Sequence, residues 1–190
     1  NEALNFYNVN GRELGDAIRA LPSVGALAWS DTLATAAESH SAAMIAADTQ
    51  SHQVDGEDAL AVRARAAGYT GFSTLGENVY AFGKSVLYAH AGFFVDWGEG
   101  ANGMQEPAGH RLNLMSASFT EVGLDVTTES VKTTSVGPYV VTEDFGSRGK
   151  FFVTGVAVAG TLLAGVVHPE SWKTSATKLT TTRTLAVTRA

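Results

Sequence analysis

Three polar residues of this chain stand where enzymes and binding proteins often keep reactive side chains. His52 lies in a predicted loop, and Glu77 and His110 each follow a glycine. Polar groups beside turn-forming residues are typical of clefts, because loops held by a rigid scaffold carry much of protein function. His52, Glu77 and His110 are therefore the candidate site residues.

Two imidazoles and a carboxylate in one cleft support three kinds of chemistry. His52 and His110 can hold Zn²⁺ or another divalent metal, with the other coordination positions left to water or a ligand. A metal-bound water can act as a nucleophile with Glu77 as general base, which makes all three residues candidate catalytic groups. The same groups can instead form a polar network that fixes the shape of the cleft. Catalytic zinc usually has three protein ligands, so a two-histidine site favours binding over hydrolysis.

The sequence lacks the short motifs of several other enzyme classes. It contains no His-Glu-x-x-His, no Gly-x-Ser-x-Gly, no phosphate-binding loop and no dinucleotide-binding glycine fingerprint. An organic cofactor is therefore not expected. None of the 190 residues is cysteine, which excludes disulfides, thiol nucleophiles and cysteine-bound metals.

Charge and hydropathy indicate which partners to expect. The formal net charge is −6 and lysine and arginine form no cluster, so we expect no nucleic-acid partner. No apolar run reaches the roughly 20 residues of a membrane helix, so no transmembrane segment is expected. The chain begins with Asn1 rather than methionine, and its C-terminal part is rich in threonine and serine. These features favour a processed, secreted protein.

Hydrophobic periodicity predicts the elements that must position these residues. A helix capped by Ser30 or Asp31 carries Leu33, His40 and Met44 on one stripe, so we expect His40 to pack in the core. The other predicted helical segments are 5–20, 59–67, 85–97 and 110–115, and the predicted strands are 77–82, 120–127, 138–145, 151–158 and 162–167. Helices come first and strands later, as in an α+β fold.

The order and spacing of these segments resemble the CAP superfamily, whose domain is also called the SCP domain. The resemblance covers residues 4–146. It rests most on Gly76-Glu77-Asn78, on Gly109-His110-Arg111-Leu112-Asn113 and on the later Glu121-Val122-Gly123. Because the chain has no cysteine, it is most similar to the bacterial extracellular branch of that family.

The resemblance implies a three-layer α-β-α sandwich with a small central antiparallel sheet and an open cleft. Residues 1–146 would form this CAP/SCP-like domain. Residues 147–190 would be a C-terminal β-rich extension or a truncated second module.

The family cleft is lined by two histidines and two acidic residues. His52, His110 and Glu77 match three of these positions, so the two histidines are also the expected metal ligands. The fourth position falls on Asp96, on Glu99 or on neither. The resemblance also places Asn78 and Arg111 in the cleft, and we expect the Arg111 side chain to brace the wall through a carboxylate.

The function implied by the resemblance is a secreted domain whose cleft binds an extracellular ligand, which is a lipid, a peptide or a glycan. A divalent metal at the two histidines would be part of that site. Two alternatives stay open. One is a metal-dependent hydrolase of peptides or esters in the same cleft, and the other is an adhesive cell-surface module that uses residues 147–190.

Overall fold

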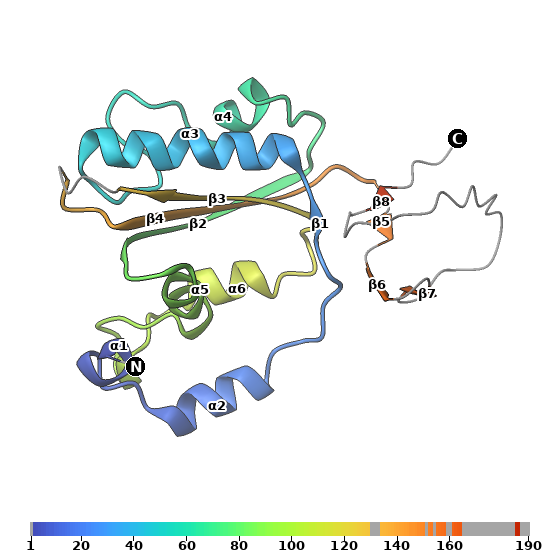
Figure 1. The fold of residues 1–190 in the computed structure, drawn as a ribbon. Coiled ribbons are helices and arrows are strands. Elements are labelled where there is room, and N and C mark those ends of the chain that lie inside the picture. The colour runs from blue at the N-terminus through green and yellow to red at the C-terminus, as the bar shows by residue number, and fades with distance from the viewer. Residues whose placement is uncertain are drawn as a thin grey trace.

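A four-stranded sheet forms the middle layer of the molecule. The computed structural model describes residues 2–129 and 134–150, and the backbone of four short strands beyond Lys150. The strand order is β1 (Ala28–Trp29), β3 (Glu121–Thr128), β4 (Tyr139–Ser147) and β2 (Thr74–Gly83). The pairs β3–β4 and β4–β2 are antiparallel, whereas the two-residue β1 joins β3 in parallel. Helices cover both faces of the sheet (Figure 1), which confirms the α+β class and the α-β-α sandwich.

One face of the sheet is covered by α3 (Asp31–Ala47) and α4 (Leu60–Ala66). The hydroxyl of Ser30 caps α3 by accepting a hydrogen bond from the N–H of Leu33, as the sequence predicts. Gly123 allows α3 to lie close to β3, because a Cβ at this position would collide with the backbone of Leu33 and Ala34. The layer between α3 and the sheet is filled by a buried cluster that includes Met44, Val79 and Val140.

The opposite face is covered by α5 (Val86–Val95) and α6 (Gly109–Leu114), which are joined through a short 3-10 turn, η1 (Ala101–Gly103). Ala89 and Phe93 of α5 pack against Val141 of β4 in a second buried cluster. Side chains of a strand alternate between the two faces of a sheet. Each strand residue therefore belongs to one helical layer or to the other.

The predicted helical segment 5–20 forms two helices, α1 (Glu2–Phe6) and α2 (Gly11–Arg19). The chain turns between them because Asn8 adopts the left-handed conformation, with φ 52°. Asn10 then caps α2 by accepting hydrogen bonds from the N–H groups of Arg12 (3.0 Å) and Glu13 (3.3 Å). Both helices lie beyond α5 and α6 in Figure 1, on the side away from the sheet. No residue of α2 is buried, so this helix is peripheral to the core.

The contacts of the sheet continue past residue 146. β4 runs to Ser147, and the guanidinium of Arg148 pairs with the buried carboxylate of Glu121. The same guanidinium lies 4.3 Å from the ring centre of Tyr69, whose hydroxyl donates to Glu121 (2.9 Å).

Beyond Lys150, β5 (Phe152–Val153) pairs with β8 (Leu185–Ala186), and β6 (Gly155–Val158) pairs with β7 (Thr161–Ala164). The predicted strands 151–158 and 162–167 fall partly on these elements and partly outside the described residues. Their assignment to an extension or to a second module stays a prediction.

The outer edge of the sheet is formed by β2 and is capped by two side-chain amides. Gln50 donates to the backbone oxygen of Val79 (3.4 Å) and accepts from the N–H of Ala81 (2.8 Å). Asn113 donates to the backbone oxygen of Glu77 (3.2 Å). These bonds occupy backbone groups that a further strand would otherwise use.

Candidate functional site

The two candidate histidines are held beside neighbouring residues of β2, in different layers of the sandwich. Glu77 faces the layer of α3 and α4, where its carboxylate binds the ring of His52. Asn78 faces the layer of α5 and α6, where its amide donates to the backbone oxygen of His110 (3.3 Å). The edge strand β2 therefore links two separate polar groups, one built around each histidine.

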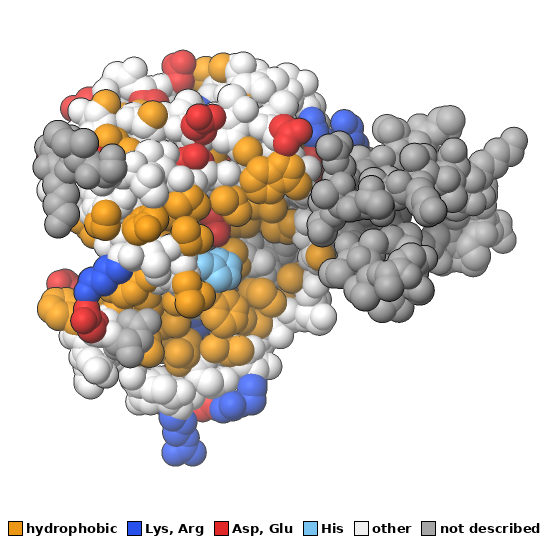
Figure 2. All heavy atoms as spheres, in the orientation of Figure 1, with side chains coloured by type: hydrophobic (Ala, Val, Ile, Leu, Met, Phe, Trp, Pro, Cys, Tyr) orange, Lys and Arg blue, Asp and Glu red, His pale blue; other side chains and the backbone are white. Residues whose placement is uncertain are grey.

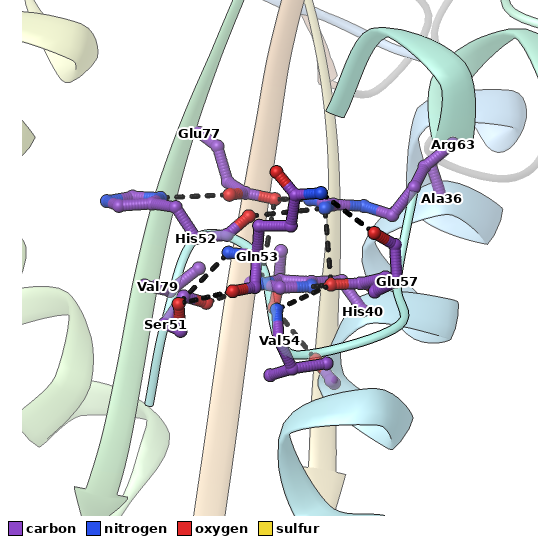
Figure 3. Close-up of polar contacts among 12 residues, drawn as sticks. Ala36, His40, Ser51, His52, Gln53, Val54, Glu57, Arg63, Glu77 and Val79 are labelled. Atoms are coloured by element: carbon purple, nitrogen blue, oxygen red, sulfur yellow. Dashed lines mark hydrogen bonds and ion pairs between the residues drawn. The ribbon is translucent and has the colours of Figure 1, made fainter. Parts of the chain in front are cut away.

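His52 lies at the exposed end of the first group. Its Nδ1 lies 2.9 Å from Oε1 of Glu77, and the two side chains are 63% and 3% exposed. Oε2 of Glu77 binds the guanidinium of Arg63, so both carboxylate oxygens are engaged. Figure 3 shows Glu77 between His52 and Arg63. Since Nδ1 of His52 faces the carboxylate, Nε2 is the ring nitrogen left for a ligand.

Three further residues extend this first group: His40, Glu57 and Arg63. His40 is fully buried, as expected, but it also forms hydrogen bonds. Its Nδ1 lies 2.8 Å from Oε1 of Glu57, and its Nε2 lies 2.8 Å from the backbone oxygen of Ser51. Both partners are hydrogen-bond acceptors. Arg63 lies 3.4 Å from Glu57 (Figure 3), so the group joins His40 and Arg63 to two carboxylates.

Sequence analysis did not identify His40, Glu57 and Arg63 as site residues, although the sequence contains a signal for His40 and Arg63. His40 lies on the apolar stripe of its helix, and Arg63 precedes Ala64 on the inward side of the next one. Ionisable side chains at inward positions need partners, because an unpaired buried charge is costly. The identity of the partners could not be read from the sequence, because Glu57 and Glu77 come from other segments of the chain.

Asp144 adds a third carboxyl group on the same face of the sheet. It lies opposite Glu77 in the register of β2 and β4, and its exposure is 0%. Neither of its carboxyl oxygens has a hydrogen-bond partner among the described residues. Burial and the negative charge of Glu77 raise the pKa of Asp144 to about 8, while Arg63 acts in the opposite direction.

The second polar group is built on Asp96 and His110. Oδ1 of Asp96 lies 2.7 Å from Nδ1 of His110, and Oδ2 accepts from the N–H groups of His110 (2.9 Å) and Arg111 (3.3 Å). Asp96 ends α5 in the left-handed conformation and is only 1% exposed. Glu99 is exposed. Of the two acidic candidates for the fourth position, Asp96 is therefore the one that binds His110.

Asn78 connects this second group to another buried carboxylate. Its Nδ2 donates to Oε2 of Glu143 (3.2 Å), and its Oδ1 accepts from Nδ2 of Asn113 (2.9 Å). Nδ1 of the exposed His90 lies 3.6 Å from Oε1 of Glu143. Burial raises the pKa of Glu143, and the hydrogen bond from Asn78 and the charge of His90 oppose this effect. Asn78 thus fixes the position of groups on two elements, α6 and β4.

The prediction that the side chain of Arg111 binds a carboxylate is wrong. Its Nη2 donates to the backbone oxygen of Val95 (2.9 Å) and lies 3.7 Å from Sδ of Met104. Only its backbone N–H reaches Asp96. The side chain is buried, and the acceptor that it finds is the carbonyl at the last residue of α5. Arg111 thus binds the end of the helix that precedes Asp96.

A cavity of about 460 Å³ opens beside His110. Its aromatic walls include Tyr80, Tyr88 and Trp97, and α1 contributes a further side. The indole Nε1 of Trp97 donates to the hydroxyl of Tyr80 (3.2 Å), which fixes these two rings relative to each other. Gln50 adds an amide to the lining. Figure 2 shows hydrophobic side chains gathered along a hollow in the middle of this face, with a histidine among them.

The fit of the site to a metal ion rests on the two histidines. Within residues 2–129 and 134–150, no three His, Asp or Glu side chains are grouped so that they could hold a metal ion. His110 lines the cavity, whereas His52 and Glu77 do not. Each of the two imidazoles nevertheless turns Nδ1 to a buried carboxylate, the arrangement that orients metal-binding histidines in proteins. The type of donor therefore fits a divalent metal, with water or ligand atoms needed for the other positions.

Comparison with solved structures supports the same fold. An extracellular protein containing an SCP domain from Bacillus anthracis is 25% identical, with a TM-score of 0.50 over 71% of this chain. This chain corresponds to 39% of the length of that protein. An outer surface protein from Borrelia burgdorferi is 16% identical, with a TM-score of 0.51 over 77% of this chain and 93% of its own. At that identity the second likeness shows the fold alone.

Comparison of the sequence itself gives the family. No curated protein matches the chain. The profile of the CAP family, described as the cysteine-rich secretory protein family, matches residues 13–145. This range contains both polar groups and the four strands of the sheet except the last two residues of β4, although the chain has no cysteine. The match confirms the expected family, and the assignment to a bacterial branch stays a prediction. The chain belongs to the CAP, or cysteine-rich secretory protein, family.

Proposed function

We propose that this domain binds an extracellular ligand in a cleft where His52 and His110 also hold a divalent cation. The observation that carries the proposal is the shared orientation of the two rings. Nδ1 of His52 lies 2.9 Å from Glu77, and Nδ1 of His110 lies 2.7 Å from Asp96. Each histidine thus keeps Nε2 for a metal or a ligand, and each is held by a carboxylate that is itself buried.

The cavity beside His110 supports a ligand with an apolar or aromatic part. Its walls combine the rings of Tyr80, Tyr88 and Trp97 with the amides of Gln50 and the nearby Gln105. Such a lining suits apolar contact supplemented by a few hydrogen bonds. An acyl chain, an aromatic peptide side chain and a sugar ring all have this character. The proposed ligand is accordingly a lipid, a peptide or a glycan.

Binding is favoured over hydrolysis by the state of Glu77. A general base needs a free oxygen within reach of the water that it deprotonates. Both oxygens of Glu77 are engaged, by His52 and by Arg63, and the side chain is 3% exposed. The adhesive alternative depends on residues 147–190, and the described part of that segment offers no observation that favours it.

An extracellular location is supported by the family and by one similar protein. The family is described as secretory, and the solved structure that is 25% identical is an extracellular protein. In the part of the chain that the structure describes, no helix is long and apolar enough to cross a membrane. We therefore propose that the domain acts outside the cell or at its surface.

A calorimetric titration of metal-stripped protein with Zn²⁺ at neutral pH tests the proposal. We expect saturable one-to-one binding by the parent protein and none by the double variant His52→Ala/His110→Ala. His90→Ala is the matched control, because His90 is also exposed and also faces a carboxylate, Glu143. This control should bind Zn²⁺ like the parent. Equal binding by the double variant, or loss of binding only in the control, would exclude the proposed metal site.

A further inference from the structure

We infer that Asp144 and Glu77 form a carboxylic acid–carboxylate pair with one proton, in which Asp144 donates to Glu77 and positions it for His52. The pair would be a permanent part of the folded domain. Its importance for ligand binding rests on the proposed function, whereas the proton itself is a property of the fold.

The register of the sheet brings the two carboxyl groups together. Glu77 of β2 and Asp144 of β4 are direct cross-strand partners. The Cβ atoms of such partners lie about 4.5–5.5 Å apart, and their side chains leave the same face of the sheet. The side chain of Glu77 is 3% exposed and Asp144 is 0% exposed. On its other side, Asp144 is opposite Gly123 of β3, which has no side chain to offer as a partner.

The charges on this face leave Asp144 without a cation of its own. The charged groups that act on Asp144 are Glu77 from β2, Arg63 from α4 and Glu57 from the segment before α4. His40 from α3 and His52 from the segment after α3 lie against Glu77. Arg63 pairs with Glu77 and Glu57. His40 pairs with Glu57, and its Nε2 lies 3.9 Å from Oε2 of Glu77.

Arg63 is the permanently charged cation of this group and already pairs with Glu77 and Glu57, so an ionised Asp144 would be a third buried carboxylate with no ion pair of its own. A proton on Asp144 removes this third negative charge. A neutral carboxyl group also has one O–H to donate, and Glu77 is the carboxylate that faces it across the strand pair. The raised pKa of Asp144 agrees with this arrangement.

The proton would fix the orientation of Glu77. The oxygens of Glu77 accept from His52 and Arg63, and the O–H of Asp144 adds a third donor. A carboxylate held from three directions keeps one oxygen aimed at Nδ1 of His52. Asp144 is then a positioning residue that acts on His52 through Glu77, with no contact to the ligand.

Infrared spectroscopy of the whole chain tests for the proton. At neutral pH we expect the carbonyl stretch of a protonated carboxylic acid, and ¹³C-labelling of aspartate should move this band to lower frequency. The band should be lost in Asp144→Asn. It should remain in the control Glu143→Gln, which removes a buried carboxyl group from the opposite face of the same strand. Absence of the band in the parent protein, or a band that is insensitive to labelled aspartate, would overturn the inference without any variant.

The tautomer of His52, read from its ¹⁵N chemical shifts, tests the positioning role. We expect the Nδ1–H tautomer in the parent and in Asp144→Asn, since an amide N–H replaces the donated O–H. Asp144→Ala should give a mixture of tautomers, and an unchanged tautomer there would overturn the positioning role.

The proposed metal site and the inferred shared proton can fail independently of each other. An aspartic acid band in a protein that binds no Zn²⁺ would remove only the metal site, and Zn²⁺ binding without the band would remove only the shared proton.

Discussion

Asp96 holds His110 at two points: one carboxylate oxygen lies 2.7 Å from the imidazole Nδ1, and the other accepts from the backbone N–H of the same residue at 2.9 Å. The orientation of the ring is therefore coupled to the start of α6. A single carboxylate caps that helix and selects the ring nitrogen that faces the cavity.

Replacement of Asp96 should accordingly affect both stability and the histidine. Asp96→Ala removes the acceptor of two backbone N–H groups and of the imidazole, so we expect a loss of about 1–3 kcal/mol in the free energy of unfolding. Asp96→Asn should cost less, because asparagine tolerates the left-handed backbone and keeps one acceptor. Urea unfolding measures these differences. Glu99→Gln, at the exposed alternative position, should leave stability unchanged. Equal effects of Asp96→Asn and Glu99→Gln on the free energy of unfolding would contradict the assignment of Asp96.

Arg63 is expected to be the most sensitive residue of the buried charge group. Arg63→Ala would leave Glu57 and Glu77 buried with less counter-charge and would remove a hydrogen bond to the backbone oxygen of His52 (3.2 Å). Breaking a buried ion pair on one side costs about 3–5 kcal/mol. Arg65→Ala on the same helix is the control, because Arg65 is exposed and contacts the ring of Phe72. Urea unfolding of the two variants should differ by most of that amount, and similar stabilities would be inconsistent with the network.

The pH dependence of stability should carry the signature of Asp144. Its pKa is raised from 3.8 to about 8 in the folded protein. Between these values the folded state holds a proton that the unfolded state has released, so this contribution falls as pH rises from about 4 to about 8. The variant Asp144→Asn has no titrating group at this position and so lacks this pH-dependent contribution to stability. Within that window the stability of the variant relative to the parent should increase by up to about 1.4 kcal/mol per pH unit. Denaturant unfolding at a series of pH values measures the difference, and parallel curves would show that Asp144 titrates normally.

Arg148 should stabilise the sheet although it follows the predicted domain boundary. Glu121 is 1% exposed, and its carboxylate binds Arg148 and the hydroxyl of Tyr69. Arg148→Ala leaves that buried carboxylate with one neutral donor, so we expect a loss of about 2–4 kcal/mol in the free energy of unfolding, less than for a fully buried pair. Arg19→Ala, which removes an exposed ion pair with Asp16, should cost less than about 1 kcal/mol. Thermal unfolding of the two variants provides the comparison.

Local sequence patterns predicted much of the scaffold. The helix after Ser30, the antiparallel strands 120–127 and 138–145, and the short helix at His110 all have strong local signals, and the structure contains each of them. The separation of α1 from α2 was not predicted, because it depends on the left-handed backbone of Asn8. Arg111 was misassigned because a backbone carbonyl, which leaves no trace in the sequence, satisfies its guanidinium.

The site itself was only partly predictable. Glu77 and His110 stand in local motifs, so they could be identified one by one. The link between His40 and Glu57 joins residues 17 positions apart, and the pairing of Glu77 with Asp144 depends on strand register. Register is set by the whole sheet rather than by the residues that it brings together.

The amide of Gln50 on the edge of β2 has a consequence for the protein in solution. An uncapped edge strand can pair with the same strand of another copy, and such pairing seeds aggregation. The Gln50 amide already forms hydrogen bonds with the carbonyl of Val79 and the N–H of Ala81. An incoming strand therefore cannot pair with these two backbone groups, which lie on either side of Tyr80. One uncharged side chain thus helps to keep the molecule soluble at the edge where its site is built.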